Sequence, residues 1–249
     1  NEALNANGIN HYQSASFTGS YLVNMLYYNS NKLALKRQSH IQTSPRLTDV
    51  YTLYHLDEHL VNGDTTFLTC IVTHLKAGST VANQNERAQS ARQIMDYIES
   101  KKLKGNLMFM GDLNVYTHLE EAFQRFISPT QSGIELHDPA NAVGPWHDNA
   151  DYAPYHTQST HISGGCFSGG GMDDRFDFIL TSSPLIEGTR GAKYVDGSYW
   201  AYGQDGNRLN GNLTNPVNTS LPADVIYALY NMSDHLPVTL KLHMDRDLY

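Results

Sequence analysis

Gly111-Asp112-Leu113-Asn114 and Ser233-Asp234-His235-Leu236-Pro237 are the two most informative stretches of this chain. Each places carboxylate, amide or imidazole side chains at the end of an apolar, strand-like run. A third such run, residues 67–73, ends in His74. Because open α/β sheets place ligands and catalytic groups at strand ends, the three stretches indicate one converging site of the enzyme type.

Composition limits the class of protein. The chain has 249 residues, which is enough for one large domain with a filled core. Its formal net charge of -8 opposes polyanions at long range and argues against broad non-specific binding to nucleic acid. It does not oppose hydrolysis of nucleic acid, because bound metal ions can reverse the charge locally. Cys70 and Cys166 make no disulfide framework, and either one bridge or two buried thiols is consistent with the sequence.

The order of apolar runs and turn residues predicts a mixed α/β organisation. No internal repeat or linker divides the chain, so residues 1–249 are expected to form a single domain. No run approaches the roughly 20 apolar residues of a membrane-spanning helix. The long irregular stretches 130–171 and 188–222 are expected to form functional surfaces. The expected strands are residues 22–28, 49–56, 66–74, 107–111, 175–181 and 237–243, and the expected helices are residues 83–102, 119–126 and 223–230.

Four motifs, in this order, resemble those of the endonuclease/exonuclease/phosphatase superfamily, whose nuclease branch is deoxyribonuclease-I-like. They are Thr73-His74, Gly111-Asp112-Leu113-Asn114, Arg175-Phe176-Asp177-Phe178-Ile179-Leu180 and Ser233-Asp234-His235-Leu236-Pro237-Val238. The resemblance implies an α/β (α+β) fold: a four-layered sandwich of two packed, mainly antiparallel sheets flanked by helices. It also implies hydrolysis of phosphodiester or phosphomonoester bonds with a divalent metal, usually Mg²⁺, with Mn²⁺ or Ca²⁺ as alternatives.

Asp112 and Asn114 are the first pair of candidate site residues. Asp112 can accept a proton from water or bind a metal, and Asn114 points to the same face of an extended segment. The resemblance implies that Asp112 orients the attacking water and that Asn114 assists it, a metal ion or a phosphate oxygen. A tight turn after a buried strand, where Asp and Asn are common, is the structural alternative.

Asp234 and His235 form the second pair. Hard cations prefer oxygen donors, so Asp234 is expected to bind the metal together with Asp112 and Asn114. His235 is expected to contact the scissile phosphate and to act as an acid or base, as imidazoles do near neutral pH. The alternative is a Ser-Asp turn with a surface histidine.

Three further residues complete the candidate site. Asp177 interrupts an apolar run, where a carboxylate is costly unless it has a partner. The resemblance implies that Asp177 orients His235, and a salt bridge between Asp177 and Arg175 is the alternative. The resemblance also makes His74 a second active-site histidine, which protonates the leaving group or binds phosphate. Arg46 would contact phosphate, for which a planar guanidinium is suited, unless it is only a surface residue.

Other polar features are less specific. Residues 164–171 are rich in glycine and are interpreted as a flexible rim loop in preference to a phosphate-binding nest. His147, His156 and His161 could shape a substrate pocket.

The superfamily's first-strand asparagine and its glutamate metal ligand have no counterpart here, and Glu2 receives no such role. We therefore interpret the chain as lacking the N-terminal strands of its domain. The leading hypothesis is a nuclease of the endonuclease type that acts on DNA or RNA. The alternatives are a phosphatase or phospholipase-like esterase acting on inositol phosphates or sphingolipids, and a non-catalytic module that retains the fold. The resemblance to acidic, lysine-poor members of this superfamily implies a secreted or periplasmic location. The oligomeric state stays open.

Overall fold

A computed structural model describes residues 2–19, 24–57 and 65–244. At its centre lies a six-stranded sheet of order β3-β4-β5-β6-β8-β7. Neighbouring strands of this sheet pair antiparallel, except that β5 and β6 run parallel. The strands are β3 (Leu33–Ile41), β4 (Thr48–His55), β5 (Phe67–His74), β6 (Asn106–Asp112), β7 (Leu136–His137) and β8 (Asp177–Ser182).

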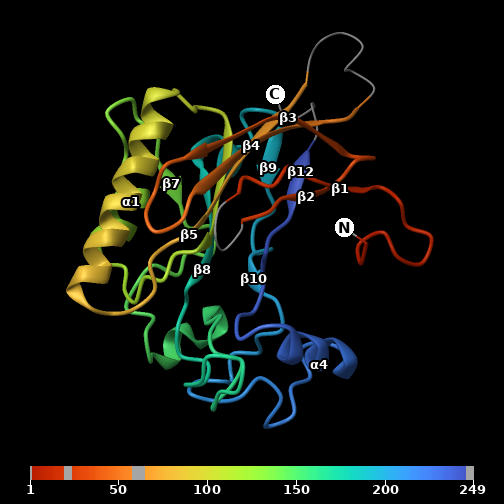
Figure 1. The fold of residues 1–249 in the computed structure, drawn as a ribbon, viewed down its shortest axis with the longest axis vertical. Coiled ribbons are helices and arrows are strands. Elements are labelled where there is room, and N and C mark those ends of the chain that lie inside the picture. The colour runs from red at the N-terminus through yellow and green to blue at the C-terminus, as the bar shows by residue number, and fades with distance from the viewer. Residues whose placement is uncertain (1, 20–23, 58–64, 245–249) are drawn as a thin grey trace.

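Helices cover one face of the sheet (Figure 1). Helix α1 (Val81–Ser100) connects β5 to β6 and begins after Thr80, whose side chain accepts the Asn83 N–H. Helix α2 (Glu121–Ile127) packs beside α1. The largest apolar cluster joins both helices to the sheet, and it includes Ile94, Ile98, Phe109, Phe123, Phe126, Trp146 and Phe178. Burial of this aromatic-rich surface is the main stabilising contribution on this side.

Short ladders form a second layer on the other side of the sheet. They pair β1 (Tyr12–Ser14) with β2 (Tyr27–Asn29) and β9 (Ala192–Tyr194) with β12 (Leu242–Met244). A third ladder pairs β10 (Trp200–Ala201) with β11 (Val238–Thr239). Figure 1 shows β9 and β12 across the sheet from α1. The predicted α+β sandwich class is thus confirmed, with ladders of two strands in the second layer.

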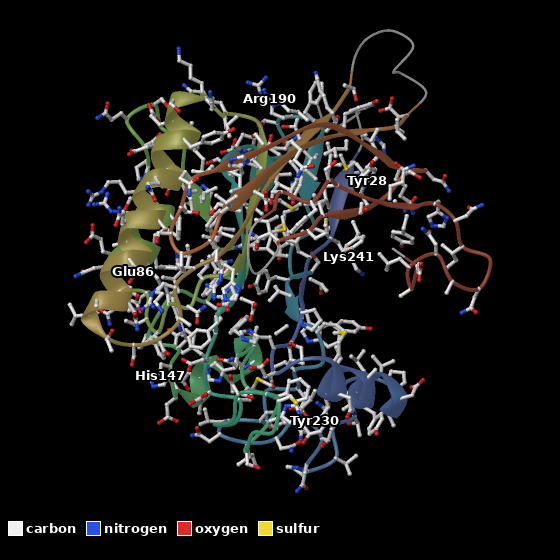
Figure 2. The ribbon with its side chains drawn as sticks, in the orientation of Figure 1. Tyr28, Glu86, His147, Arg190, Tyr230 and Lys241 are labelled. Carbon is white, nitrogen blue, oxygen red and sulfur yellow. The ribbon has the colours of Figure 1, made fainter. Side chains whose placement is uncertain are left out.

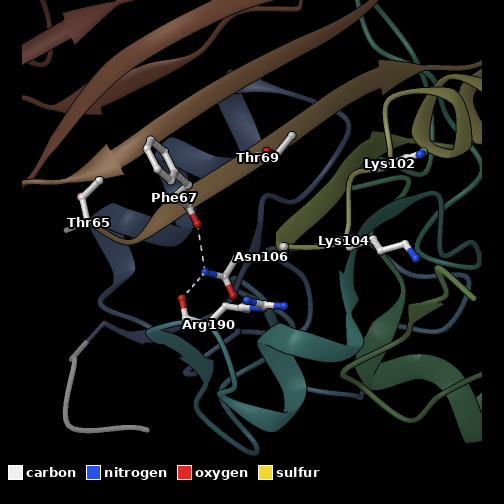
Figure 3. Close-up of a pocket in the computed structure, with 8 residues that line it drawn as sticks. Thr65, Phe67, Thr69, Lys102, Lys104, Asn106 and Arg190 are labelled. Carbon is white, nitrogen blue, oxygen red and sulfur yellow. Dashed lines mark hydrogen bonds between the residues drawn. The ribbon is translucent and has the colours of Figure 1, made fainter. Parts of the chain in front are cut away.

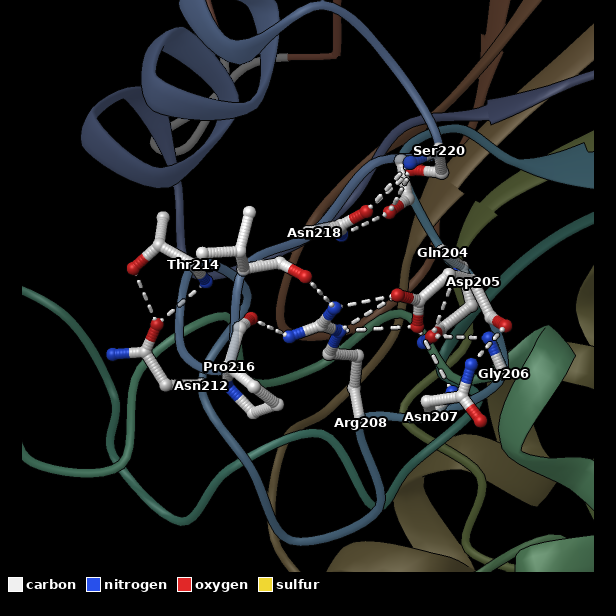
Figure 4. A network of polar contacts seen from close by, with 12 residues as sticks. Gln204, Asp205, Gly206, Asn207, Arg208, Asn212, Thr214, Pro216, Asn218 and Ser220 are labelled. Carbon is white, nitrogen blue, oxygen red and sulfur yellow. Dashed lines mark hydrogen bonds and ion pairs between the residues drawn. The ribbon is translucent and has the colours of Figure 1, made fainter.

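The remaining elements are α3 (Ser183–Glu187), α4 (Ala223–Met232) and a 3₁₀ helix at Ala150–Tyr155. Between β10 and α4 the chain contains a buried arginine, Arg208. Its guanidinium pairs with Asp205 and donates to the carbonyl oxygens of Pro216 and Val217 (Figure 4). Arg208 therefore links residues 205, 216 and 217 of a stretch that contains no long helix or strand.

The expected strands at residues 49–56, 66–74, 107–111 and 175–181 and the three expected helices are confirmed to within a few residues. The expected strand at residues 237–243 is wrong as one element, because its two ends pair with different partners as β11 and β12. Residues 22 and 23 of another expected strand lie outside the described residues, and its end forms β2. The strand β3 is not predicted by the sequence analysis.

Both cysteines are free thiols, Cys70 buried and Cys166 exposed, so neither expected arrangement holds. Burial raises the pKa of Cys70 to about 12. Among the described residues, no helix combines the length and apolarity needed to cross a membrane.

Candidate active site

Three of the predicted site residues lie side by side at one edge of the main sheet. The parallel strands β5 and β6 end at the same edge, and their register places His74 beside Asp112. The antiparallel strand β8 begins there, with Asp177 opposite Asp112. Cross-strand partners share a face of the sheet, so the register alone forms a row of His74, Asp112 and Asp177.

Gly111 allows these strands to approach each other. Its φ is +136°, in the range that favours glycine. A Cβ atom at this position would lie 1.8 Å from the carbonyl oxygen of Thr73 on the neighbouring strand. The glycine of the Gly-Asp-Leu-Asn stretch is therefore required by the pairing that sets His74 beside Asp112.

The Asp112 carboxylate has a partner on each oxygen. Its Oδ2 lies 3.2 Å from Nε2 of His74, and its Oδ1 accepts the backbone N–H of Asn114 at 2.9 Å. Asn114 is buried, has a φ of 50°, and donates from Nδ2 to the carbonyl oxygen of Leu75 at 3.2 Å. The expected tight turn is therefore present, and it leaves the carbonyl oxygen of the Asn114 side chain as a further candidate ligand atom.

His235 is brought to this row by a hydrogen bond to Asp177. Nδ1 of His235 lies 2.7 Å from Oδ2 of Asp177. The backbone N–H of Asp177 in turn donates to the hydroxyl of Thr157, which fixes the start of β8. Burial lowers the pKa of His235, but the hydrogen bond and the negative charge of Asp177, with the charges of Asp112 and Asp234, outweigh it and raise that pKa to about 9.

Gln158 is a site residue that the sequence analysis does not identify. Its Nε2 lies 2.8 Å from Nε2 of His235 and 3.3 Å from Oδ2 of Asp234. The amide nitrogen can donate to a neutral imidazole, whereas a protonated His235 needs an acceptor at the same place. Gln158 lies in an irregular loop, so no local pattern in the sequence marks it.

Asp234 is oriented by the glycine-rich loop. Its Oδ2 accepts the backbone N–H of Ser168 at 3.1 Å. Burial raises the pKa of Asp234, but the hydrogen bonds from Ser168 outweigh this and hold it below its usual value. The loop is tied down by His161, whose ring stacks on Phe167 at 4.5 Å and on Tyr230 of α4 at 3.9 Å. The glycine-rich loop therefore lines the site next to Asp234.

The predicted metal ligands do not form a closed cluster of donor atoms. Among the residues that the structure describes, only His147, Asp173 and Asp174 form a group of at least three His, Cys, Asp or Glu ligand atoms within 4.8 Å of one another. Asp112, Asn114 and Asp234 nevertheless supply oxygen atoms, the donors that hard divalent cations prefer. One or two carboxylates with several waters are the usual protein ligation of Mg²⁺, so this donor set fits such an ion.

The residues His147, Asp173 and Asp174 lie in the irregular segment between β7 and β8. Nδ1 of His147 lies 2.7 Å from Oδ1 of Asp174, and burial raises the pKa of Asp174 to about 6. His156 is fully buried, and its ring nitrogens lie 2.6 Å from the carbonyl oxygen of Trp146 and 3.3 Å from that of Met172. Of the three histidines considered for a substrate pocket, only His147 has an exposed side chain.

The two arginines of the candidate site differ in their surroundings. Arg46 donates to the carbonyl oxygens of His74 and Leu75, at 3.2 and 2.8 Å, so its guanidinium lies beside the backbone at the end of β5. Burial lowers its pKa, and the charge of Asp112 opposes that shift. Arg175 is fully buried and makes a bidentate pair with Asp138, at 2.7 and 2.8 Å. The alternative salt bridge between Arg175 and Asp177 is therefore wrong.

Comparison with known proteins identifies solved structures with a similar fold. No family model matches the sequence, and no curated protein matches it. Among solved structures, the human Nocturnin catalytic domain with bound sulfate anion matches with a TM-score of 0.56 at 15% identity, covering 94% of this chain and 73% of that chain. An endonuclease/exonuclease/phosphatase from Bacteroides vulgatus matches with a TM-score of 0.55 at 14% identity, covering 94% and 77%.

A third similar structure is D. rerio TDP2 complexed with single strand DNA product, with a TM-score of 0.55 at 13% identity, covering 97% of this chain and 80% of that chain. At these identities the likeness is one of fold. The resemblance of the sequence motifs to this superfamily is therefore confirmed at the level of three-dimensional structure. The chain has the endonuclease/exonuclease/phosphatase fold.

Proposed function

We propose that this chain carries the catalytic residues of a metal-dependent phosphodiesterase that acts on nucleic acid. The observation that supports it most is the row of His74, Asp112 and Asp177, with His235 hydrogen-bonded to Asp177. Carboxylates and imidazoles that converge at a sheet edge suit activation of water and neutralisation of phosphate charge. The presence of single strand DNA product in the similar D. rerio TDP2 structure supports nucleic acid as the substrate class.

In this proposal Asp112, Asn114 and Asp234 would hold a divalent cation, Mg²⁺ or Mn²⁺, with Ca²⁺ as an alternative. A bound cation supplies positive charge at the non-bridging phosphate oxygens. A local reversal of charge is needed because the chain carries a formal net charge of -8.

The chain's own residues position the water, the phosphate and the leaving oxygen. Asp112, held by His74 and by the Asn114 N–H, orients the attacking water. Asp177 holds Nδ1 of His235, so that Nε2 of His235 faces the scissile phosphate and donates to it when protonated. His74 protonates the leaving oxygen or binds the phosphate, and Arg46 adds positive charge behind it.

Activity assays test this proposal. We expect the protein to cleave single-stranded and plasmid DNA, or RNA, in the presence of Mg²⁺ or Mn²⁺ and to lose this activity in EDTA. A simple phosphomonoester, such as an inositol phosphate, should be hydrolysed far more slowly. Faster hydrolysis of the phosphomonoester would favour a phosphatase, and no hydrolysis of either substrate would contradict the proposal.

Replacing Gln158 by alanine should lower kcat/KM for phosphodiester cleavage by about tenfold, since a hydrogen bond to a charged group is worth about 1.5–3 kcal/mol. The charged group is the Asp234 carboxylate, which accepts a hydrogen bond from the Gln158 amide at 3.3 Å beside His235. Steady-state kinetics against Gln124→Ala, a change on α2, provide the comparison. An unchanged kcat/KM in Gln158→Ala would show that the amide does not position either residue.

A further inference from the structure

Five positively charged side chains mark a second surface, at the end of the main sheet away from the active site. Lys36 and Arg37 belong to β3, Lys102 and Lys104 follow α1, and Arg190 follows α3. All five are exposed, and they are five of the chain's 17 Lys and Arg residues. Within the described part of the chain none of them has an ion-pair partner. We call these five residues, with Phe67 and Asn106, the basic surface.

Two neighbouring cavities lie on the basic surface. One of about 410 Å³ lies among Phe67, Asn106, Lys102, Lys104 and Arg190 (Figure 3). A second of about 320 Å³ is lined by Lys36, Arg37, Thr52 and Phe67. Phe67 lines both, and Thr52 is the cross-strand partner of Thr69, which lines the first. The two cavities therefore share Phe67 as a common wall, and between them they are lined by all five cations.

Asn106 gives the first cavity a fixed polar wall. Its side chain is only 4% exposed, and its Nδ2 donates to the carbonyl oxygens of Phe67 and Arg190, at 2.9 and 2.8 Å (Figure 3). These two bonds fix the amide, and its Oδ1 is left buried with no hydrogen-bond partner. An unpaired buried acceptor is costly, so a ligand that donates a hydrogen bond here would gain from it. The ligand thus needs both hydrogen-bond donors and negative charge.

A β-bulge brings an aromatic ring and a cation together at the centre of the basic surface. The pairing of β3 with β4 shifts register between Leu35 and Arg37, which leaves Lys36 as the extra residue. Its Nζ lies 4.1 Å from the centroid of the Phe67 ring, which is 39% exposed. Exposed rings among cations are how proteins bind single-stranded nucleic acid, because bases stack on rings while cations contact phosphates.

We propose that the basic surface binds single-stranded nucleic acid, with phosphates at the cations and a nucleotide donor group at Asn106. The surface is separate from the catalytic row, because β5 has eight residues and, at roughly 3.3 Å per residue, places Phe67 about 23 Å from His74. The two side chains also point to opposite faces of the sheet. Figure 2 shows Arg190 at the end of the molecule opposite to His147.

Fluorescence anisotropy with a labelled oligothymidylate of about 16 nucleotides tests this proposal. The measurement is made in EDTA, so that it reports binding alone and does not depend on the proposed hydrolysis. We expect salt-sensitive binding by the wild-type protein, and about tenfold weaker binding by the double variant Lys104→Ala/Arg190→Ala. Removing two phosphate contacts should also flatten the slope of log K against log salt by about 1.4.

The matched control is the double variant Lys32→Ala/Lys241→Ala, which removes two exposed lysines outside the basic surface. Its affinity should equal that of the wild-type protein. Absence of binding by the wild-type protein, or equal losses in the two double variants, would overturn the proposal. A competition experiment compares polyglutamate with unlabelled DNA. If the two displace the labelled oligonucleotide equally, the proposal is overturned, because the surface would then accept any acidic polymer.

Discussion

His235→Ala is expected to lower kcat/KM for phosphodiester hydrolysis by at least about a thousandfold, within the range that acid–base groups contribute. The imidazole is hydrogen-bonded to the Asp177 carboxylate at 2.7 Å and faces the phosphate position in our proposal. Its loss also leaves the Asp177 carboxylate without its cationic partner. Single-turnover cleavage of a labelled oligonucleotide measures the effect, and His137→Ala on β7 serves as the control.

Asp177→Asn separates the chemical role of this pair from a structural one. The variant keeps the shape of the side chain but removes the charge that raises the pKa of His235 to about 9. That pKa should therefore fall towards the ordinary value of about 6.5. Activity that needs protonated His235 is lost as the pH rises through this pKa, so the alkaline limb of the pH–rate profile should move to lower pH. An unshifted limb, or near-normal activity of His235→Ala, would contradict the assigned role.

Gly111→Ala is expected to destabilise the protein by about 3 kcal/mol or more, which is in the range of severe backbone and packing defects. The new Cβ would lie 1.8 Å from the Thr73 carbonyl oxygen, at a φ of +136° that L-residues rarely adopt. The strands β5 and β6 would have to separate, and His74 would move away from Asp112. Urea denaturation measures the free energy of unfolding.

Gly105→Ala is the matched control for that change. It lies directly before the same strand, and a Cβ there meets nothing within 4 Å. Its effect on the free energy of unfolding should stay within about 0.5 kcal/mol. Equal effects of the two substitutions would show that the close approach at Gly111 does not limit stability.

The site residues that local patterns could predict are those at strand ends. His74, Asp112 and Asp177 each terminate or begin an apolar run, and the register of β5, β6 and β8 then brings them together. Gln158 could not be predicted in this way, because its contacts with Asp234 and His235 depend on the path of an irregular loop. The partner of Arg175 could not be predicted either, because Asp138 lies in a different loop.

The helices and strands likewise differ in whether a local sequence pattern predicts them. Helix α1 could be predicted because apolar residues recur on its buried face, among them Ile94 and Ile98. The strand β3 has no such signal, because Lys36 and Arg37 interrupt its alternation at the bulge. It is a strand because β4 offers it a partner along most of its length.

The parallel pairing of β5 with β6 also bears on how the chain folds. Parallel strands cannot be joined by a hairpin, so His74 meets Asp112 only after the crossover through α1 has closed. The bond between His235 and Asp177 spans a further 58 residues. Contacts this distant in sequence form slowly, because their loop-closure entropy is lost before the contacts stabilise the chain. We therefore expect the core beneath α1 to acquire protection from hydrogen exchange before the catalytic residues reach their final positions.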